Sequence, residues 1–358
     1  MENSSTVWQD LQYRERMEYL LESGHLSDCS FAVFEEGTKM IIKCHKFVLI
    51  SSSPVFERMF EGDFEESKTS NHIVLDDVSG QDFKKFIEYL YWHDNRCLQE
   101  YELPTLQTLI YLSKKFLVST MVNKCLDAIK RRLAIGLDAD ITVDLFAYAH
   151  QIDNSDLLTS AKMVLRQNPL LYIDAEAVYD LSSDVFLKFI FEFQSLVTER
   201  KRFDVIDRYC RTQGLIGTPS TPTANNKDAD TAAAVSSMKK VATTNIVLNV
   251  GESADELKTI KKDENDNEIK TKKDDPAPFK EADNENPEQE EEEKRDREKN
   301  NEFIKTLISN VQFSKMSPYD FCSGPGVSGL LTYDTKFQLL SNICVCVEKN
   351  RLLSTARP

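Results

Sequence analysis

One stretch of this sequence divides it, because that stretch cannot build a hydrophobic core. Residues 251–300 contain 19 acidic and 11 basic residues, and their large apolar residues are only Leu257, Ile260, Ile269 and Phe279. Such a segment buries too little apolar surface to offset the conformational entropy lost on folding. Residues 216–250 are rich in Thr, Ala, Asn and Ser. We therefore predict a long disordered acidic insert over residues 216–300, between folded blocks at 1–215 and 301–358.

The net charge of −15 over 358 residues argues against two kinds of partner. Residues 1–215 alone carry 24 basic and 34 acidic residues, so the first folded block is itself acidic. An acidic surface repels nucleic-acid phosphates and anionic lipid headgroups. The sequence also has no run of 18 apolar residues that could cross a bilayer. We expect no nucleic-acid partner and no membrane partner.

Cysteine usage and the N-terminus indicate a protein of the cytoplasm or the nucleus, with the cytoplasm as the first expectation. The first residues lack the basic and apolar regions of a signal peptide. Eight cysteines are scattered without a CxxC pair, a pattern typical of reduced thiols. Cys344 and Cys346 have no second ligand pair at zinc spacing, so we predict no metal and no cofactor.

The pattern of apolar residues changes near residue 137. Before it, alternation over residues 29–34 predicts a strand, and Met40–Lys43 a second strand after a Glu36-Gly37 turn. A third strand is expected at 72–75, and helices at 80–92, 104–116 and 118–134. After residue 137 the apolar residues recur at helical spacing only. The sequence thus predicts an α+β block followed by an all-helical array.

A set of short segments in the first block occurs in a recognisable order. They are Ser27–Phe31, Cys44–Leu49, Ser51–Phe56, Met59–Phe60, His72–Leu75, Phe86–Tyr91 and Leu112–Leu117. Together they resemble a BTB (POZ) domain over about residues 7–134. The helical array after residue 137 is similar to a BACK domain, which follows the BTB domain in cullin-3 adaptors. Residues 8–17 and 321–331 resemble the BTB-BACK subgroup that carries a C-terminal PHR domain.

The resemblance implies a domain order, and this sequence departs from it by one insert. It implies an N-terminal dimerisation helix at 1–24, a BTB/POZ domain at 25–134, a BACK-like region at 137–215 and its remainder at 301–350. The insert at 216–300 splits the BACK-like region where relatives have a short connection. Because the sequence stops at residue 358, we expect no PHR domain in it.

Phe64 and Glu66 are the predicted cullin-3-binding residues. Phe64 is a large apolar residue in an otherwise acidic segment, Glu61–Ser67. The segment resembles the hydrophobic-x-Glu motif by which BTB domains contact cullin-3. Phe64 would fill an apolar notch in the partner, while Glu66 fixes the loop or meets a basic group. The alternative is that Phe64 covers the core of its own chain.

Five residues are predicted at a two-fold dimer interface, and they are Met17, Leu20, Leu21, Asp28 and Lys46. A carboxylate between an amphipathic helix and an apolar strand needs a partner. The BTB resemblance implies that Asp28 packs at the dimer interface near Lys46. The alternative is that Asp28 caps a helix or turn.

The sequence does not favour an enzyme. His45 lies beside Cys44 but starts an apolar helix, and no GxSxG elbow is present, so we expect a structural histidine. Gly324-Pro325-Gly326 opens a formal GxGxxG, yet Pro325 removes a donor and no strand precedes it, so a turn between helices is expected.

The expected function is a non-enzymatic adaptor. It forms a homodimer through its BTB domain, binds cullin-3 and recruits an unknown client protein for ubiquitination. The alternative is a BTB scaffold in transcriptional or cytoskeletal complexes without cullin activity. A third reading is an attenuating relative that occupies cullin-3 without delivering a client.

Overall fold

The computed structural model describes residues 8–62, 72–94, 96–216 and 287–355. The α+β block holds the strands β1 (Cys29–Glu35), β2 (Thr38–Cys44) and β3 (Ile73–Ser79). Its helices are η1 (Trp8–Asp10), α1 (Tyr13–Ser23), α2 (Lys46–Ser52), α3 (Pro54–Glu61), α5 (Gly80–Trp92), η2 (Cys97–Gln99), α6 (Leu103–Lys115) and α7 (Ser119–Ile135). Among the described residues no helix is long and apolar enough to cross a membrane.

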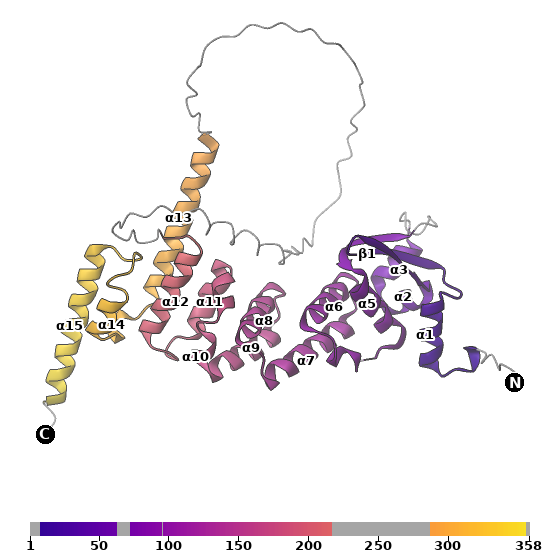
Figure 1. The fold of residues 1–358 in the computed structure, drawn as a ribbon, viewed down its shortest axis with the longest axis horizontal. Coiled ribbons are helices and arrows are strands. Elements are labelled where there is room, and N and C mark those ends of the chain that lie inside the picture. Colours follow the sequence, from indigo (N-terminus) through magenta and orange to yellow (C-terminus); the bar gives the residue numbers. More distant parts are fainter. Residues whose placement is uncertain (1–7, 63–71, 95, 217–286, 356–358) are drawn as a thin grey trace, which may run out of the picture. The chain divides into compact units, whose positions relative to one another are not determined.

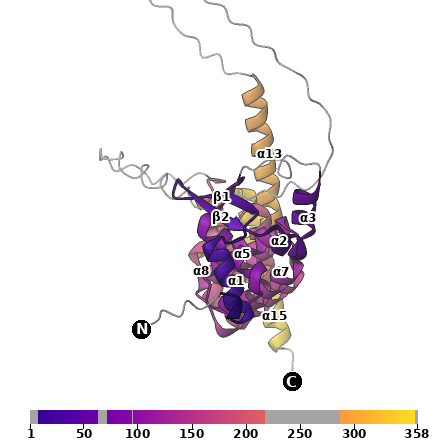
Figure 2. The same cartoon turned by 90° about the vertical axis from the view of Figure 1, so that its right-hand side faces the viewer.

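The three strands form one sheet in the order β2-β1-β3. β1 and β2 pair antiparallel from Cys29–Cys44 to Glu35–Thr38, and β3 runs parallel to β1. Glu36 and Gly37 make the predicted turn with φ values of 47° and 78°, the left-handed conformation that a two-residue hairpin needs. The predicted strands and the three helices after them are confirmed, and β1 and β3 lie against α5 (Figure 2).

A cluster of phenylalanine rings forms the centre of the α+β block. The ring of Phe116, at the end of α6, stacks on Phe56 of α3 with centroids 4.4 Å apart. Phe31 of β1 meets Phe83 of α5 edge to face at 5.0 Å. All four side chains are buried, so sheet and helices share one core.

Among the described residues after 137, every regular element is a helix, as predicted (Figure 1). They are α8 (Ala139–Gln151), α9 (Ser155–Gln167), α10 (Pro169–Tyr172), η3 (Glu176–Asp180), α11 (Ser183–Glu192) and α12 (Glu199–Thr212). Side chains of Asp138, Asn154 and Thr198 accept hydrogen bonds from the first free N–H groups of α8, α9 and α12. The predicted order, an α+β block followed by an all-α region, is confirmed.

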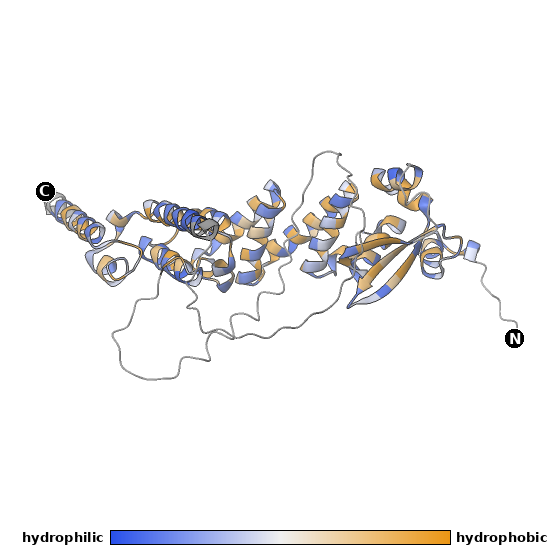
Figure 3. Ribbon diagram, turned by 90° about the horizontal axis from the view of Figure 1, so that it is seen from above, coloured by the Kyte–Doolittle hydropathy of each residue, from blue (hydrophilic) through white to orange (hydrophobic). Residues whose placement is uncertain are grey.

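The acidic insert ends earlier than its composition predicts. Residues 217–286 lie outside the described residues, but helix α13 (Pro287–Ser309) begins inside the predicted disordered range. Its hydrophilic first half is blue in Figure 3, and ion pairs such as Arg295–Glu291 at 3.3 Å link successive turns. Glu, Lys and Arg favour a helix even where no side chain is buried. The low apolar content of this segment therefore predicted disorder where a helix forms.

The chain after α13 packs onto α12. It contains η5 (Phe313–Lys315), α14 (Pro318–Ser323) and α15 (Tyr333–Thr355). The ring centroids of Phe313 and Phe203 lie 6.0 Å apart, and Leu307, in the last turns of α13, is fully buried. Residues 303–355 therefore belong to the same compact unit as residues 8–216, although 217–302 separate them in sequence.

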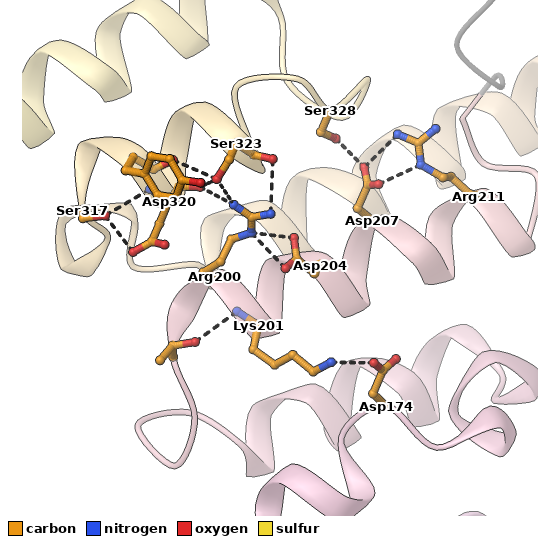
Figure 4. Close-up of polar contacts among 12 residues, drawn as sticks. Asp174, Arg200, Lys201, Asp204, Asp207, Arg211, Ser317, Asp320, Ser323 and Ser328 are labelled. Atoms are coloured by element: carbon orange, nitrogen blue, oxygen red, sulfur yellow. Dashed lines mark hydrogen bonds and ion pairs between the residues drawn. The ribbon is translucent and has the colours of Figure 1, made fainter.

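Arg200 of α12 holds α14 in place (Figure 4). Its Nε donates to both carboxylate oxygens of Asp204 at 2.8 and 2.9 Å. Its Nη1 donates to the Asp320 carbonyl at 2.7 Å, and Nη2 to the Ser323 carbonyl at 3.2 Å. The guanidinium lies against Gly324, where an added Cβ would come within 2.6 Å of it. Gly324 thus serves a turn between helices, as the sequence predicted.

Replacing Gly324 by Ala should destabilise the protein by about 1–2 kcal/mol, because the methyl group would displace Arg200 from its partners. Urea unfolding of both variants measures the change. Gly329→Ala is the matched control, since its added Cβ would meet nothing within 4 Å. We expect that control to stay within about 0.5 kcal/mol of wild type. Equal losses in the two variants would show that Arg200 does not depend on Gly324.

Candidate partner-binding surfaces

Asp28 and Lys46 meet at the start of α2. The backbone N–H of Lys46 donates to Oδ1 of Asp28 at 2.7 Å. The first N–H groups of a helix have no partner within the helix, and a carboxylate there also suits the helix dipole. Within one chain Asp28 therefore acts as the helix cap that the sequence left open as an alternative. Its carboxylate is exposed, so its predicted place at a two-fold interface stays a prediction.

His45 is a structural residue at the same junction. Its Nε2 lies 2.7 Å from the His25 carbonyl, and its Nδ1 lies 2.7 Å from the Tyr91 hydroxyl. A carbonyl can only accept, so Nε2 carries the proton and Nδ1 accepts from Tyr91. The same hydroxyl accepts the backbone N–H of His45 at 2.9 Å. Both ring nitrogens therefore have partners, and the ring joins the segment after α1 to the end of α5.

Helix α1 is anchored to the end of α5. Arg14 forms an ion pair with Asp94 and lies 5.9 Å from the centre of the Trp92 ring. The backbone N–H of Arg96 and then the Arg14 guanidinium lower the pKa of Asp94 to about 2. Asp94 thus stays ionised at neutral pH and keeps its attraction for Arg14.

The predicted dimer residues on α1 differ in exposure. Leu21 is only 7% exposed and belongs to the core of its own chain. Met17 packs partly against that core, and Leu20 is half-buried. Among these three, Leu20 and Met17 keep surface that a partner could cover.

Two exposed apolar residues beside this junction were missed by the sequence analysis. Phe47 is 80% exposed in the first turn of α2, and Leu26 is 69% exposed with a left-handed φ of 62°. Leu26 lies between His25 and Asp28, which bind the two residues that start α2. A signal existed for Phe47, because four successive apolar residues, Phe47–Ile50, cannot all face one side of a helix.

Phe64 and Glu66 lie outside the described residues. The segments on both sides of them are fixed, since Phe60 of α3 is buried and Ile73 of β3 pairs with Phe31. The turn after α6 lies against α3, because the Ser53 hydroxyl donates to the Phe116 carbonyl at 2.5 Å. Leu117, the next residue, is 60% exposed with a φ of 54°.

The described part of the chain offers little to a metal or a small molecule. No group of three His, Cys, Asp or Glu side chains there could hold a metal ion. Two hollows lined by described residues measure about 230 and 180 Å³. Small-molecule sites are typically roughly 300–1,000 Å³. The exposed apolar side chains are therefore the stronger candidates for function.

Comparison with known proteins matches residues 17–133 to the BTB/POZ domain. The chain is 26% identical to BTB/POZ domain-containing protein 6 of Xenopus tropicalis over 226 residues, which cover 59% of this chain and 39% of that protein. Human BTB/POZ domain-containing protein 6 is 25% identical, with 58% and 37% covered. Kelch-like protein 40 of Xenopus laevis is 24% identical, with 60% and 33% covered. The chain thus matches well under half the length of these relatives.

Tyr91→Phe should destabilise the protein by about 1–3 kcal/mol, because it leaves the backbone N–H and Nδ1 of His45 without their shared partner. Thermal or urea unfolding measures the loss. Tyr111→Phe is the matched control, since its hydroxyl donates to the exposed carboxylate of Asp77, where water can replace it. A loss no greater than the control's would show that the Tyr91 hydroxyl does not stabilise the fold through His45.

Proposed function

We propose, from the BTB/POZ domain at residues 17–133, that this chain is a non-enzymatic adaptor. It dimerises through that domain, binds cullin-3 and brings a client protein to a ubiquitin ligase. The chemistry would belong to other subunits of the complex. The observation that carries the proposal is the exposed apolar surface of Leu26 and Phe47, on a domain type that the resemblance associates with dimers. These residues lie where the segment after α1 meets the start of α2, which we call the α1–α2 junction.

The dimer surface consists of Leu26 and Phe47 with the Asp28–Lys46 contact between them. Single exposed apolar residues are common on monomers, but neighbouring large ones rimmed by charges favour an interface. The hydrogen bonds from His45 to His25 and from Lys46 to Asp28 make the surface rigid before a partner arrives. A pre-ordered surface loses less entropy on association.

The cullin-3 surface would combine two segments. The first is the loop that holds Phe64 and Glu66, which resembles the hydrophobic-x-Glu motif. The second is the turn at Leu117, which the stacking of Phe116 on Phe56 holds against the helix that precedes that loop. An exposed leucine in a strained left-handed conformation supports a functional role at this turn.

Phe47→Glu should convert the dimer to a monomer, because it places a charge in the apolar centre of the surface. Sedimentation velocity at micromolar concentration separates the two states. Leu170→Glu is the control, since Leu170 is 68% exposed on α10, away from the α1–α2 junction. A wild-type protein that sediments as a monomer would contradict the dimer proposal.

Phe64→Ala should weaken cullin-3 binding by roughly 30-fold or more, because an interface anchor loses about 2 kcal/mol on truncation. Titration of the cullin-3 N-terminal region against both proteins gives the affinities. Met163→Ala truncates another exposed apolar residue, on α9, and should leave the affinity unchanged. Unchanged binding by Phe64→Ala would sink the assignment of this loop. A wild-type dimer without cullin-3 affinity would support the scaffold alternative instead.

A further inference from the structure

A hollow beside helix α7 is lined by cations, although the block that contains it is acidic. It measures about 230 Å³, and its walls come from α7, η2 and the residue before η2. The residues that line this basic hollow are Arg96, Leu98, Gln99, Lys124 and Arg131. Three of them are cations and none is an acid, whereas residues 1–215 as a whole carry 24 basic and 34 acidic residues.

Hydrogen bonds hold the walls of the basic hollow in place. Nη2 of Arg132 donates to the Gln99 carbonyl at 2.7 Å, which ties η2 to α7. The backbone N–H and Nε of Arg96 donate to Oδ1 of Asp94 at 2.8 and 3.3 Å. Asp94 also pairs with Arg14, so one carboxylate serves two guanidinium groups. A site that is ordered in advance loses less entropy when a ligand binds.

Two of the lining cations, Lys124 and Arg131, form no ion pair with a described residue. Both side chains are exposed, and their separation of about two helical turns places them on one face of α7. Asp127 lies between them in sequence, but its carboxylate pairs with Lys130 at 3.1 Å. The basic hollow therefore keeps a positive charge that the described part of the chain does not neutralise.

The chemistry of the basic hollow fits one phosphoryl group. A phosphorylated side chain carries a charge of about −1.5 to −2 and three strong acceptor oxygens. Arginine forks bind such oxygens in bidentate pairs, and lysine adds a point charge. A carboxylate carries a single charge and would leave more of the cationic set uncompensated. The volume lies below the roughly 300 Å³ at which sites for whole small molecules begin, so a side chain of a larger partner fits better than a free nucleotide.

We propose that the basic hollow binds a phosphorylated serine or threonine side chain of a partner protein. Nucleic acids and anionic bilayers contact many basic residues at once. Here Asp94, Glu100 and Asp127 stand close to the lining residues in sequence, so the positive surface is local and suits a single anionic group. The site uses none of the residues assigned to the dimer surface or the cullin-3 surface. The proposal therefore goes beyond the adaptor function and does not depend on it.

Fluorescence anisotropy with the full chain tests this site. The probe is a labelled pool of short peptides with phosphoserine at the centre and mixed residues elsewhere, and two matching pools carry serine or glutamate at the centre. We expect the phosphoserine pool to bind at least about tenfold more tightly than either of the others. Equal binding of the serine pool would overturn the proposal. Equal binding of the glutamate pool would overturn it too, because the hollow would then select any carboxylate.

Two double variants separate the basic hollow from general attraction by charge. Lys124→Gln with Arg131→Gln should weaken binding of the phosphoserine pool at least about tenfold. Lys315→Gln with Lys349→Gln removes the same charge from exposed positions outside the hollow and should leave the affinity unchanged. Equal weakening in both would overturn the proposal. Cosedimentation with phosphatidylserine vesicles that only the first double variant loses would assign the hollow to a membrane and overturn it as well.

Discussion

The buried ion pair of Glu199 and Arg202 is the contact on which the second half of the fold depends. Both side chains are at most 4% exposed, and Nη1 of Arg202 donates to Oε2 of Glu199 at 2.8 Å. Nη1 also reaches the Asn310 carbonyl at 3.3 Å, and the same glutamate oxygen accepts the N–H of Gln312 at 3.1 Å. A buried charge that loses its partners costs several kcal/mol. Residues 199–202 and the chain after α13 must therefore fold together.

This constraint explains how a fold tolerates an interruption of residues 217–302. The entropy cost of closing a loop grows only with the logarithm of its length, about 0.6 kcal/mol for each doubling. Against that cost stand the ion pair, the Arg200 hydrogen bonds to α14 and the packing of Phe313 on Phe203. Tyr209 and Phe303, near the two ends of the interruption, have ring centroids only 6.3 Å apart. The chain thus contacts α12 again at Phe303, the first large apolar residue of α13.

The α+β block could be predicted from the sequence because its signals are local. The strand predicted over residues 29–34 and the turn at Glu36-Gly37 each depend on neighbouring residues, and both are confirmed. Burial along β1 does not alternate as predicted, because Phe31, Ala32 and Val33 are all buried. Arg202 was missed because it stands in a charged run that reads as a solvent-exposed helix, and its acceptor Asn310 is remote in sequence. The exposure of Phe47 was not predicted, because a residue that begins the apolar run Phe47–Ile50 is expected in the core. The first turns of α13 were predicted to be disordered because they contain few apolar residues, although a charged helix can form without burying one face.

The closeness of Tyr209 and Phe303 also has a practical meaning for anyone who engineers this protein. A foreign domain whose own termini lie near each other could replace residues 217–286 without pulling α12 and α13 apart. A fluorescent reporter placed there would leave the N-terminus, the α1–α2 junction and α15 unmodified. The position thus offers an internal label for following the protein in cells while both termini stay unmodified.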